Sequence, residues 1–488
     1  MAEQKPNRLT EHQVALRTLL LAILGLLVVW ILSYLRARPA DSGPSAHPLD
    51  VIRVFTYVDF LRGFGMMFLQ ILLSSLIGDA IGLVAGSLIL RSARLSQAAL
   101  RFLRIGLWLP FFVFWALPIW SLRVELRFDI ISWMVILTAG VVALLPTVSL
   151  AACYYFLTAR ITLELDRYQA RRWVIKETAL LALLLCLFFQ MWLRPYGWDW
   201  FILTLKGERS QGYGALIFLL AFLWMLNSLF RPRFDHSAQL QGSILLREVG
   251  DRGSGSIWDV VLLAGLWVLL WQLLSKPLRV FFLINPPLEI LAAGYALLIG
   301  GMNIPNMDPT IWPHVGVSLI EIICGLVVAA GAALIVFGGL SASDALRSWV
   351  LPILPVTYVA PIAIPLLLLE PLRLVGSWQA AAQIAFLTFF PIVQVIWGLR
   401  GRPLLCRLLL ALDKALPFAF VIMLFGELWA AIRGLGFFIV VTTNMHHIAE
   451  GIAASLVTFA LLVLLSSTLR WIVKKLYFSE EKKQATPA

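Results

Sequence analysis

Charged residues are scarce in this chain, and a nucleotide-binding motif is missing. Only 14% of its 488 residues are Asp, Glu, Lys or Arg, 60% are apolar, and the mean hydropathy is +0.88. This composition excludes an ordinary soluble protein and indicates an integral membrane protein. The chain contains no Gly-Lys dipeptide and therefore no Walker A motif, so any ATP hydrolysis requires a separate subunit.

Cysteine is also scarce, and no arrangement of residues typical of an enzyme is found. The spacing of the four cysteines fits neither a metal site nor a disulfide framework. No Ser/His/Asp triad or carboxylate pair falls in a plausible pocket, so an enzyme is only a distant third hypothesis. We expect no cofactor and no resident metal.

The net charge of +12 could suggest nucleic-acid binding, but its distribution indicates otherwise. Lys and Arg lie in short segments between apolar runs, which is typical of membrane topology, and no nucleic-acid partner is expected. The first apolar run, 15–35, is long enough to span a bilayer and lacks a small-residue cleavage site. A cleavable signal peptide is therefore not expected.

Apolar runs of about 20 residues can cross the ~30 Å hydrocarbon layer as helices, and the sequence predicts twelve of them. The fold class is therefore all-α and polytopic. If the amino terminus is inside, the inner segments hold 26 of the 39 basic residues, which predicts that both termini are cytoplasmic. The predicted spans are 15–35, 65–90, 104–122, 130–157, 177–193, 213–230, 257–275, 314–340, 346–369, 378–399, 411–432 and 450–470.

The spans divide into two sets of six around a polar stretch. SLIGDAIGLV (75–84) and SLIEIICGLV (318–327) match at six of ten positions with an offset of 243, and the same offset relates Pro118 to Pro361. Chance similarity between apolar helices is the alternative, but the preserved offset favours two parallel repeats. The predicted units are 1–230, a cytoplasmic linker 231–256, 257–478, and a cytoplasmic tail 479–488.

Three further stretches accompany the proline-rich region 312–400: WDVVLLAGLWVLLWQLL (258–274), NPPLEILAAGYALL (285–298) and GELWAAIRGLGFFI (426–439). Together they make 257–478 resemble the inner-membrane permease subunit of bacterial ABC importers of the nitrate/sulfonate/taurine type. The chain as a whole then looks like a tandem fusion of two such permeases.

The resemblance implies the fold of a type I ABC importer permease, located in the bacterial inner membrane. It implies a cytoplasmic ATP-binding subunit in two copies, a periplasmic solute-binding protein and the lipid bilayer as partners. The family's usual cargo is small oxyanions or organosulfur compounds, moved by alternating access. Nothing in the sequence identifies the solute.

The resemblance fails at the cytoplasmic coupling element known as the EAA loop. The second half has only RGRPLLCR (400–407) there, whereas the first half has RITLELDRYQARRWVIKE (160–177). We expect 160–177 to form an amphipathic helix along the inner face and to make the principal ATPase contact. A membrane-surface helix held by anionic lipids is the alternative. The candidate coupling residues are Arg167, Gln169, Arg171, Arg172 and Arg402.

The rival function is an accessory or structural membrane subunit with a degenerate permease fold that is not coupled to ATP.

Charged residues within spans are candidates for function, because burying them in lipid is costly. Asp79, Glu321 and Glu427 are of this kind, and they either line the passage or form structural hydrogen bonds. Pro118 and Pro361 bend helices that flank the translocation path in the family, although packing alone could also explain them.

Two glycines and a histidine pair lie on the predicted outer face. Gly434 and Gly436 follow Glu427 and form either a periplasmic gate or an ordinary turn. His446 and Glu450 could bind a metal if they shared a helix face, but no third ligand is in view. An exposed loop at the membrane surface is the favoured interpretation.

Overall fold

The computed structural model describes residues 58–109, 112, 130–192, 238, 242–246, 265, 268–269, 271–273, 285–301, 308–343, 377–430, 433–445 and 447–478. The elements in these ranges are all helical, and no β-strand occurs among them. Among the described residues, five helices are long and apolar enough to cross a membrane: Gly65–Ile89, Gly140–Thr162, Trp312–Ala342, Trp378–Gly398 and Ile448–Leu476. The chain is thus a helical membrane protein, and these helices coincide with five of the predicted spans. The full set of twelve stays a prediction.

The first group of helices comes from the amino-terminal half. It consists of α3 (Val58–Ile89), α4 (Ala93–Gly106), α7 (Ile130–Leu157) and α8 (Arg167–Trp192). The backbones of α3 and α7 approach closely at Gly82, where an added Cβ would lie 2.5 Å from the Ser149 carbonyl oxygen. Small residues at such crossings replace the hydrophobic driving force that helices lack inside lipid.

The second group comes from the carboxyl-terminal half. It consists of α13 (Pro287–Ile299), α14 (Trp312–Ala342), α18 (Ser377–Gly398), α19 (Leu404–Ala430), α20 (Leu435–Asn444) and α21 (Ile448–Val473). Here Gly325 of α14 takes the role of Gly82. An added Cβ on Gly325 would lie 2.6 Å from the Ile384 Cβ and 2.7 Å from the Ala381 carbonyl oxygen, both on α18.

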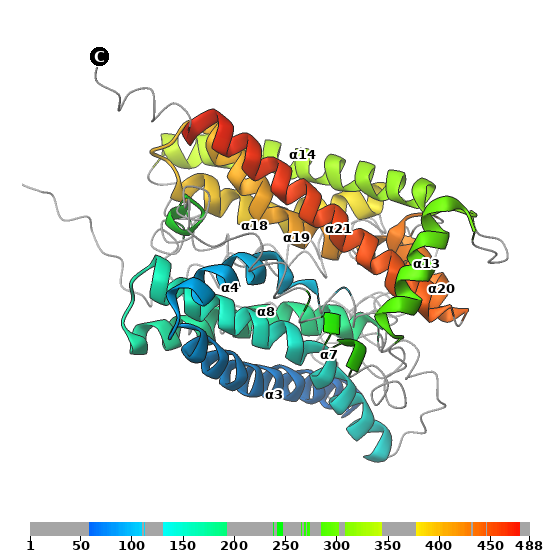
Figure 1. Ribbon diagram of the computed structural model, residues 1–488. Helices are drawn as coiled ribbons and strands as arrows, with labels where there is room; N and C mark the ends of the chain where they lie inside the picture. The colour runs from blue at the N-terminus through cyan, green and yellow to red at the C-terminus, as the bar shows by residue number, and fades with distance from the viewer. Residues whose placement is uncertain are drawn as a thin grey trace, which may run out of the picture.

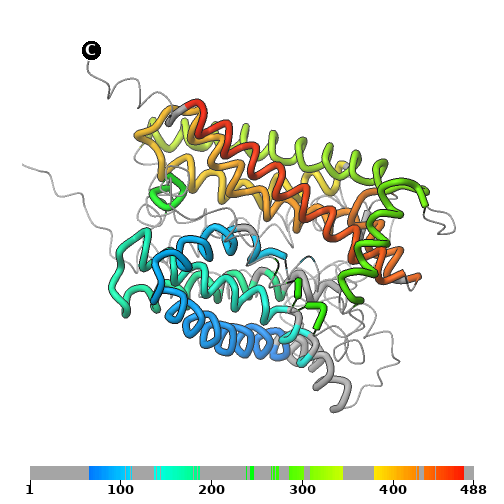
Figure 2. The backbone as a smooth tube through the Cα atoms, in the orientation of Figure 1, coloured from blue at the N-terminus to red at the C-terminus, as the bar shows by residue number. Residues whose placement is uncertain are grey.

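The two groups lie side by side (Figure 1), and aromatic side chains meet between them. The rings of Trp108 and Phe418 meet edge to face with centroids 5.5 Å apart. On the outside, α3 and α14 lie on opposite sides of the molecule, as the tube in Figure 2 also shows. Val84 of α3 is 61% exposed and Ile335 of α14 is 78% exposed, as expected of side chains that face lipid.

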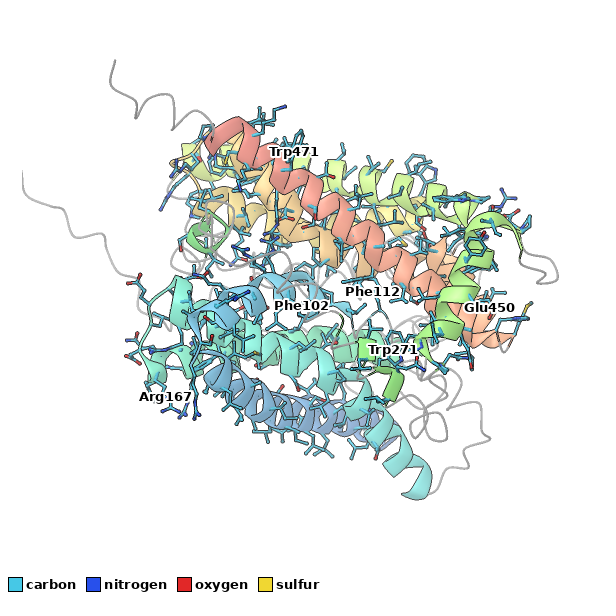
Figure 3. All side chains as sticks on the ribbon, in the orientation of Figure 1. Phe102, Phe112, Arg167, Trp271, Glu450 and Trp471 are labelled. Carbon is cyan, nitrogen blue, oxygen red and sulfur yellow. The ribbon has the colours of Figure 1, made fainter. Side chains whose placement is uncertain are left out.

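The helices run between two ends that differ in charge. Figure 3 places Arg167 and Trp471 at one end and Glu450 at the other. The first end gathers the connections 90–93, 158–166 and 399–403, whereas α13 and α20 lie at the opposite end (Figure 1). The basic residues in or next to the connections at the first end are Arg91, Arg94, Arg160, Arg167, Arg171, Arg172, Arg400, Arg402, Arg407, Lys474 and Lys475.

The segment 160–177 does not form the separate surface helix that we expected. A π-helical turn, Thr158–Thr162, ends α7, and a tight turn follows in which Glu164 has a φ of +54°. From Arg167 the chain is already in α8, which continues without interruption to Trp192. No Gly or Pro separates the charged part from the apolar part, so nothing in the sequence stops the helix.

Two further segments differ from the expectation of plain polar connections. Residues 93–106 form the amphipathic helix α4, which buries Ala98 and Leu103, and the Ser92 hydroxyl accepts a hydrogen bond from the Leu95 N–H at 3.3 Å. Part of the predicted linker, 242–246, is helical, and its Leu245 is buried. The rest of the linker lies almost entirely outside the described residues.

Candidate functional site

Two glutamates meet in the interior of the second group. Glu321 of α14 and Glu427 of α19 are 1% and 0% exposed, and their carboxyl groups are within hydrogen-bonding contact. Both residues are sequence-predicted candidates, and the structure brings them together.

The carboxyl group of Glu427 is held by partners from α14 and α20. The Ser318 hydroxyl donates a hydrogen bond to its Oε1, and the backbone N–H of Gly436 donates to its Oε2 at 2.5 Å. The same Ser318 hydroxyl accepts a hydrogen bond from the Leu435 N–H at 2.8 Å. The first N–H groups of a helix have no partner within it, and here α14 and α19 supply partners for α20.

The glycines before and within α20 make this contact possible. Gly434 has a φ of +131°, and an added Cβ would lie 2.3–2.5 Å from the carboxyl atoms of Glu427. An added Cβ on Gly436 would lie 2.3 Å from the Leu424 carbonyl oxygen. The two glycines predicted as gate residues therefore belong to the same cluster as Glu427, because only glycine fits there.

A chain of polar groups extends from this cluster towards the surface. The Nδ1 atom of His314 lies 3.1 Å from both the backbone N and the backbone O of Gly434. Its Nε2 atom lies 3.7 Å from the Asp308 carboxylate, which is 3.8 Å from the guanidinium of Arg433. His314 is 2% exposed, whereas the Arg433 side chain is 63% exposed. We call Glu321, Glu427, Ser318, His314 and the turn 433–436 the acidic cluster.

Asp79, the third acidic candidate, lies in the other helix group. It sits on α3, is 7% exposed, and is hydrogen-bonded to the Thr178 side chain of α8. The structure therefore does not bring Asp79 to the acidic cluster. The candidates Pro118 and Pro361 lie outside the described residues.

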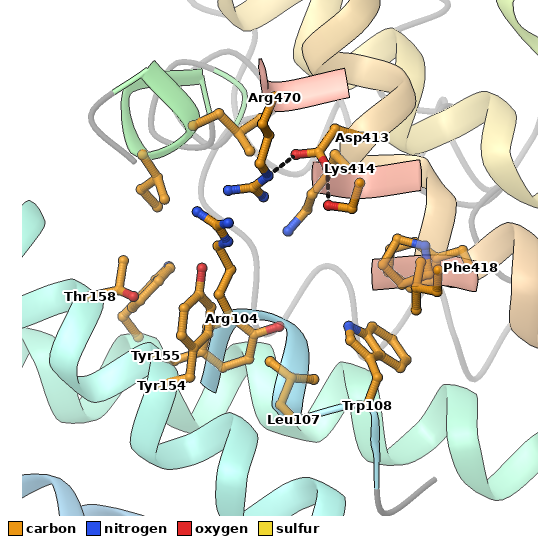
Figure 4. A pocket seen from close by; sticks show the side chains of 16 residues that line it. Arg104, Leu107, Trp108, Tyr154, Tyr155, Thr158, Asp413, Lys414, Phe418 and Arg470 are labelled. Atoms are coloured by element: carbon orange, nitrogen blue, oxygen red, sulfur yellow. Dashed lines mark hydrogen bonds and ion pairs between the residues drawn. The ribbon is translucent and has the colours of Figure 1, made fainter. Parts of the chain in front are cut away.

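A cavity of about 80 Å³ lies where the two helix groups meet (Figure 4). Within it, the Asp413 carboxylate is paired with the Arg470 Nε at 2.7 Å and accepts a hydrogen bond from the Ser466 hydroxyl at 2.5 Å. The residues that line the cavity are Arg104, Leu107, Trp108, Tyr154, Tyr155, Thr158, Trp173, Ile244, Leu245, Asp413, Lys414, Pro417, Phe418, Leu462, Ser466 and Arg470.

None of the charged residues of the cavity was among the sequence-predicted sites. Asp413 and Lys414 interrupt the apolar stretch LLLALDKALPFAF (408–420), and this interruption is the pattern that could have revealed them. Arg104 lies in the last turn of α4 and at the start of the predicted span 104–122. Its place beside the cavity depends on how α4 packs against α7, which the sequence does not determine.

The candidate coupling residues lie at one end of the molecule. The first turns of α8 carry four of them, all exposed: Arg167, Gln169, Arg171 and Arg172. Asp166 caps the N-terminus of α8, because its Oδ1 atom accepts a hydrogen bond from the Gln169 N–H at 2.8 Å. Arg402 is exposed in the turn 399–403. Figure 1 shows both segments at the same end of the molecule, but it does not show them as neighbours.

The HHxxE stretch lies at the start of α21. α20 ends at Asn444 and α21 begins at Ile448, so His447 and Glu450 belong to the turn and to the following helix. The His447 Nδ1 lies 3.3 Å from the Glu450 carboxylate, and His446 is outside the described residues. Among the residues that the structure describes, no three His, Cys, Asp or Glu side chains gather as metal ligands would.

Comparison with known proteins finds no matching family model, no similar curated protein and no similar solved structure.

Proposed function

We propose that this protein is the transmembrane permease of an ATP-driven importer for a small solute. The observation that carries the proposal is the burial of ionisable groups, Glu321 with Glu427 and Asp79, inside both helix groups of a membrane protein. Such groups are costly to place in a bilayer, and an ionisable residue inside a membrane span is by default a candidate for a solute or ion pathway. The passage would run between the two groups, which alternate in exposing it.

Similar local packing in the two groups supports a tandem pair of permease units. In each, a glycine of the first helix touches the second helix, as Gly82 does on α7 and Gly325 on α18. In each, an acid one turn before that glycine meets the third helix: Asp79 meets α8 and Glu321 meets α19. The glycines are offset by 243, whereas their partner carbonyls, at 149 and 381, are offset by 232. A duplication would thus need connections of different length.

The charge difference between the two ends supports an inner-membrane topology with both termini in the cytoplasm. Basic residues mark cytoplasmic segments, and they gather at the end that includes 158–166, 399–403 and the end of α21. That end would face the ATP-binding subunits, and the acidic cluster and α13 would face a periplasmic solute-binding protein. Following the family resemblance, the solute class would be a small oxyanion or an organosulfur compound.

One observation favours the rival function, an accessory membrane subunit that is not coupled to ATP. The connection between α18 and α19 is only the turn 399–403, which leaves no room for a coupling helix of the EAA type. Coupling would then depend on the exposed first turns of α8.

Purification of the tagged full-length chain from its native membrane tests the proposal. We expect an ATP-binding subunit to co-purify in two copies per chain, and the complex to hydrolyse ATP. Replacement of Glu427 by Gln should leave the subunits bound, because the acidic cluster is far from the coupling end. A stable complex that contains other membrane subunits and no nucleotide-binding protein would favour the accessory function instead.

A further inference from the structure

The contacts between the two helix groups differ from the contacts within each group. Inside a group, helices meet backbone to backbone at a glycine, as α3 and α7 do at Gly82. Among the described helices, no pair from different groups makes backbone contact of similar extent. Because side chains rather than backbones meet between the groups, the groups can separate without breaking a close helix contact. The joint between them is therefore the part of the described chain best suited to move.

Two pairs of aromatic rings bridge this joint. Trp108 and Phe418 meet edge to face with ring centroids 5.5 Å apart and planes inclined by 78°. The rings of Phe112 and Phe459 have centroids 6.0 Å apart and planes inclined by 53°. The Phe112 N–H donates a hydrogen bond to the Trp108 carbonyl oxygen at 3.2 Å, so these two residues are one helical turn apart. The pairs thus form two successive layers between the groups.

The aromatic layers close off the inner side of the cavity of Figure 4. α4 and α19 begin at the basic end of the molecule and α21 ends there (Figure 1). The cavity is lined by Ser466, near that end of α21, and by Trp108 and Phe418, which lie together at one edge of it in Figure 4. Phe112 and Phe459 lie further from the basic end along their helices. A passage between the groups would therefore meet the cavity at the basic end and the aromatic layers beyond it.

We propose that Trp108, Phe112, Phe418 and Phe459 form a gate that closes the passage towards the basic end, and we call these four residues the aromatic gate. Ring contacts of this kind contain no hydrogen bond, so the rings can part without leaving a buried polar group unpaired. The gate rests on the proposed function, because it presumes a passage between the groups. It adds which residues close that passage and at which end.

The accessibility of a buried thiol tests the gate in the full-length chain. The four native cysteines are replaced by Ala, and Ser455→Cys places one thiol on α21, a turn beyond Phe459 and fully buried. A small, membrane-impermeant thiosulfonate is added to the basic end in oriented membrane vesicles. Its reaction rate reports how often the gate opens. No solute or ATP-binding subunit is needed, so failure of this test is distinct from failure of the proposed function.

We expect Trp108→Ala and Phe112→Ala each to raise the reaction rate at position 455 about tenfold, since an aromatic contact with its buried area is worth about that factor in an opening equilibrium. Trp108→Phe keeps a ring and should react nearly as slowly as the unchanged gate. Phe337→Ala is the matched control, because it removes an edge-to-face pair with Trp397 inside the second group, and the rate should not change.

Two further thiols separate gating from other effects. Lys474→Cys, exposed at the basic end, should react at the same rate in every variant, which shows that the reagent reaches that end. A protein that retains only Cys186, buried in α8 beside Met67 of α3, should stay unreactive when Trp108→Ala is added.

The proposal is wrong if neither Trp108→Ala nor Phe112→Ala raises the rate at position 455. It is also wrong if Phe337→Ala raises that rate as much, or if Cys186 becomes equally reactive, because the protein has then only loosened. If Trp108→Ala does not fold, Phe112→Ala and the milder Phe418→Leu decide the matter by the same criteria.

Discussion

Replacement of Gly434 by Ala should strongly destabilise the protein. Gly434 has a φ of +131°, which L side chains rarely adopt, and the new Cβ would lie 2.3–2.5 Å from the carboxyl atoms of Glu427. That carboxyl group accepts the hydrogen bond of the Gly436 N–H, so it cannot move without giving up this partner.

Three costs contribute to the expected loss. An unfavourable backbone conformation costs about 1–3 kcal/mol. Overpacking against a fixed group costs about 1–3 kcal/mol. A buried N–H that loses its acceptor costs about 1–3 kcal/mol. Since relaxation relieves part of each, we expect a loss of about 3–6 kcal/mol in the free energy of unfolding.

Unfolding in mixed micelles with increasing SDS measures this free energy, and Gly331→Ala is the control. Nothing lies within 4 Å of a Cβ added to Gly331 in α14, so that change should be neutral or should stabilise by roughly 0.5–1 kcal/mol. Adding Glu427→Ala to Gly434→Ala should remove the overlap between the new Cβ and the carboxyl group. The double variant should therefore lose less free energy of unfolding than the sum of the two single changes. Equal unfolding free energies for Gly434→Ala and Gly331→Ala would refute the reasoning.

Three other changes test the helix contacts and the topology. Gly82→Ala and Gly325→Ala should each cost about 1–3 kcal/mol in the same unfolding assay, because each new Cβ meets the backbone of the neighbouring helix; unchanged stability would mean that the helices are not in close contact there. Ser318→Ala should cost about 1–3 kcal/mol, since the first N–H of α20 loses its acceptor, and a loss as small as that of a surface serine would contradict this. Reporter fusions after Arg252 and at the C-terminus should read cytoplasmic and a fusion near Asn306 periplasmic; an external C-terminus would overturn the tandem arrangement.

Hydrophobicity was enough to predict the helical fold class and the long apolar helices. The predicted span 130–157 and the helix α7 have the same bounds, and 314–340 falls within α14. A bilayer imposes length and apolar character on any helix that crosses it, and both can be read from the sequence. The amphipathic helix α4 was not predicted. An amphipathic helix was predicted within 160–177, but not that 167–177 would continue directly into the apolar part of α8.

The components of the acidic cluster were predictable, but their assembly was not. Intramembrane charge identified Glu321 and Glu427, and turn chemistry identified Gly434 and Gly436. That Ser318 joins them depends on how α14, α19 and α20 pack, which periodicity does not determine. The cavity charges depend in the same way on contacts between two groups that are distant in sequence.

Site-specific cross-linking to the ATP-binding subunit tests whether the first turns of α8 couple this chain to ATP hydrolysis. Cysteines at Gln169 in the first turns of α8 and at Pro403 before α19 are placed one at a time in the full chain and are linked in native membranes. We expect strong linking to the ATP-binding subunit from 169 and weaker linking from 403. Strong linking from 403 with none from 169 would contradict the assignment of the coupling element, and linking from neither would contradict an ATP-driven transporter.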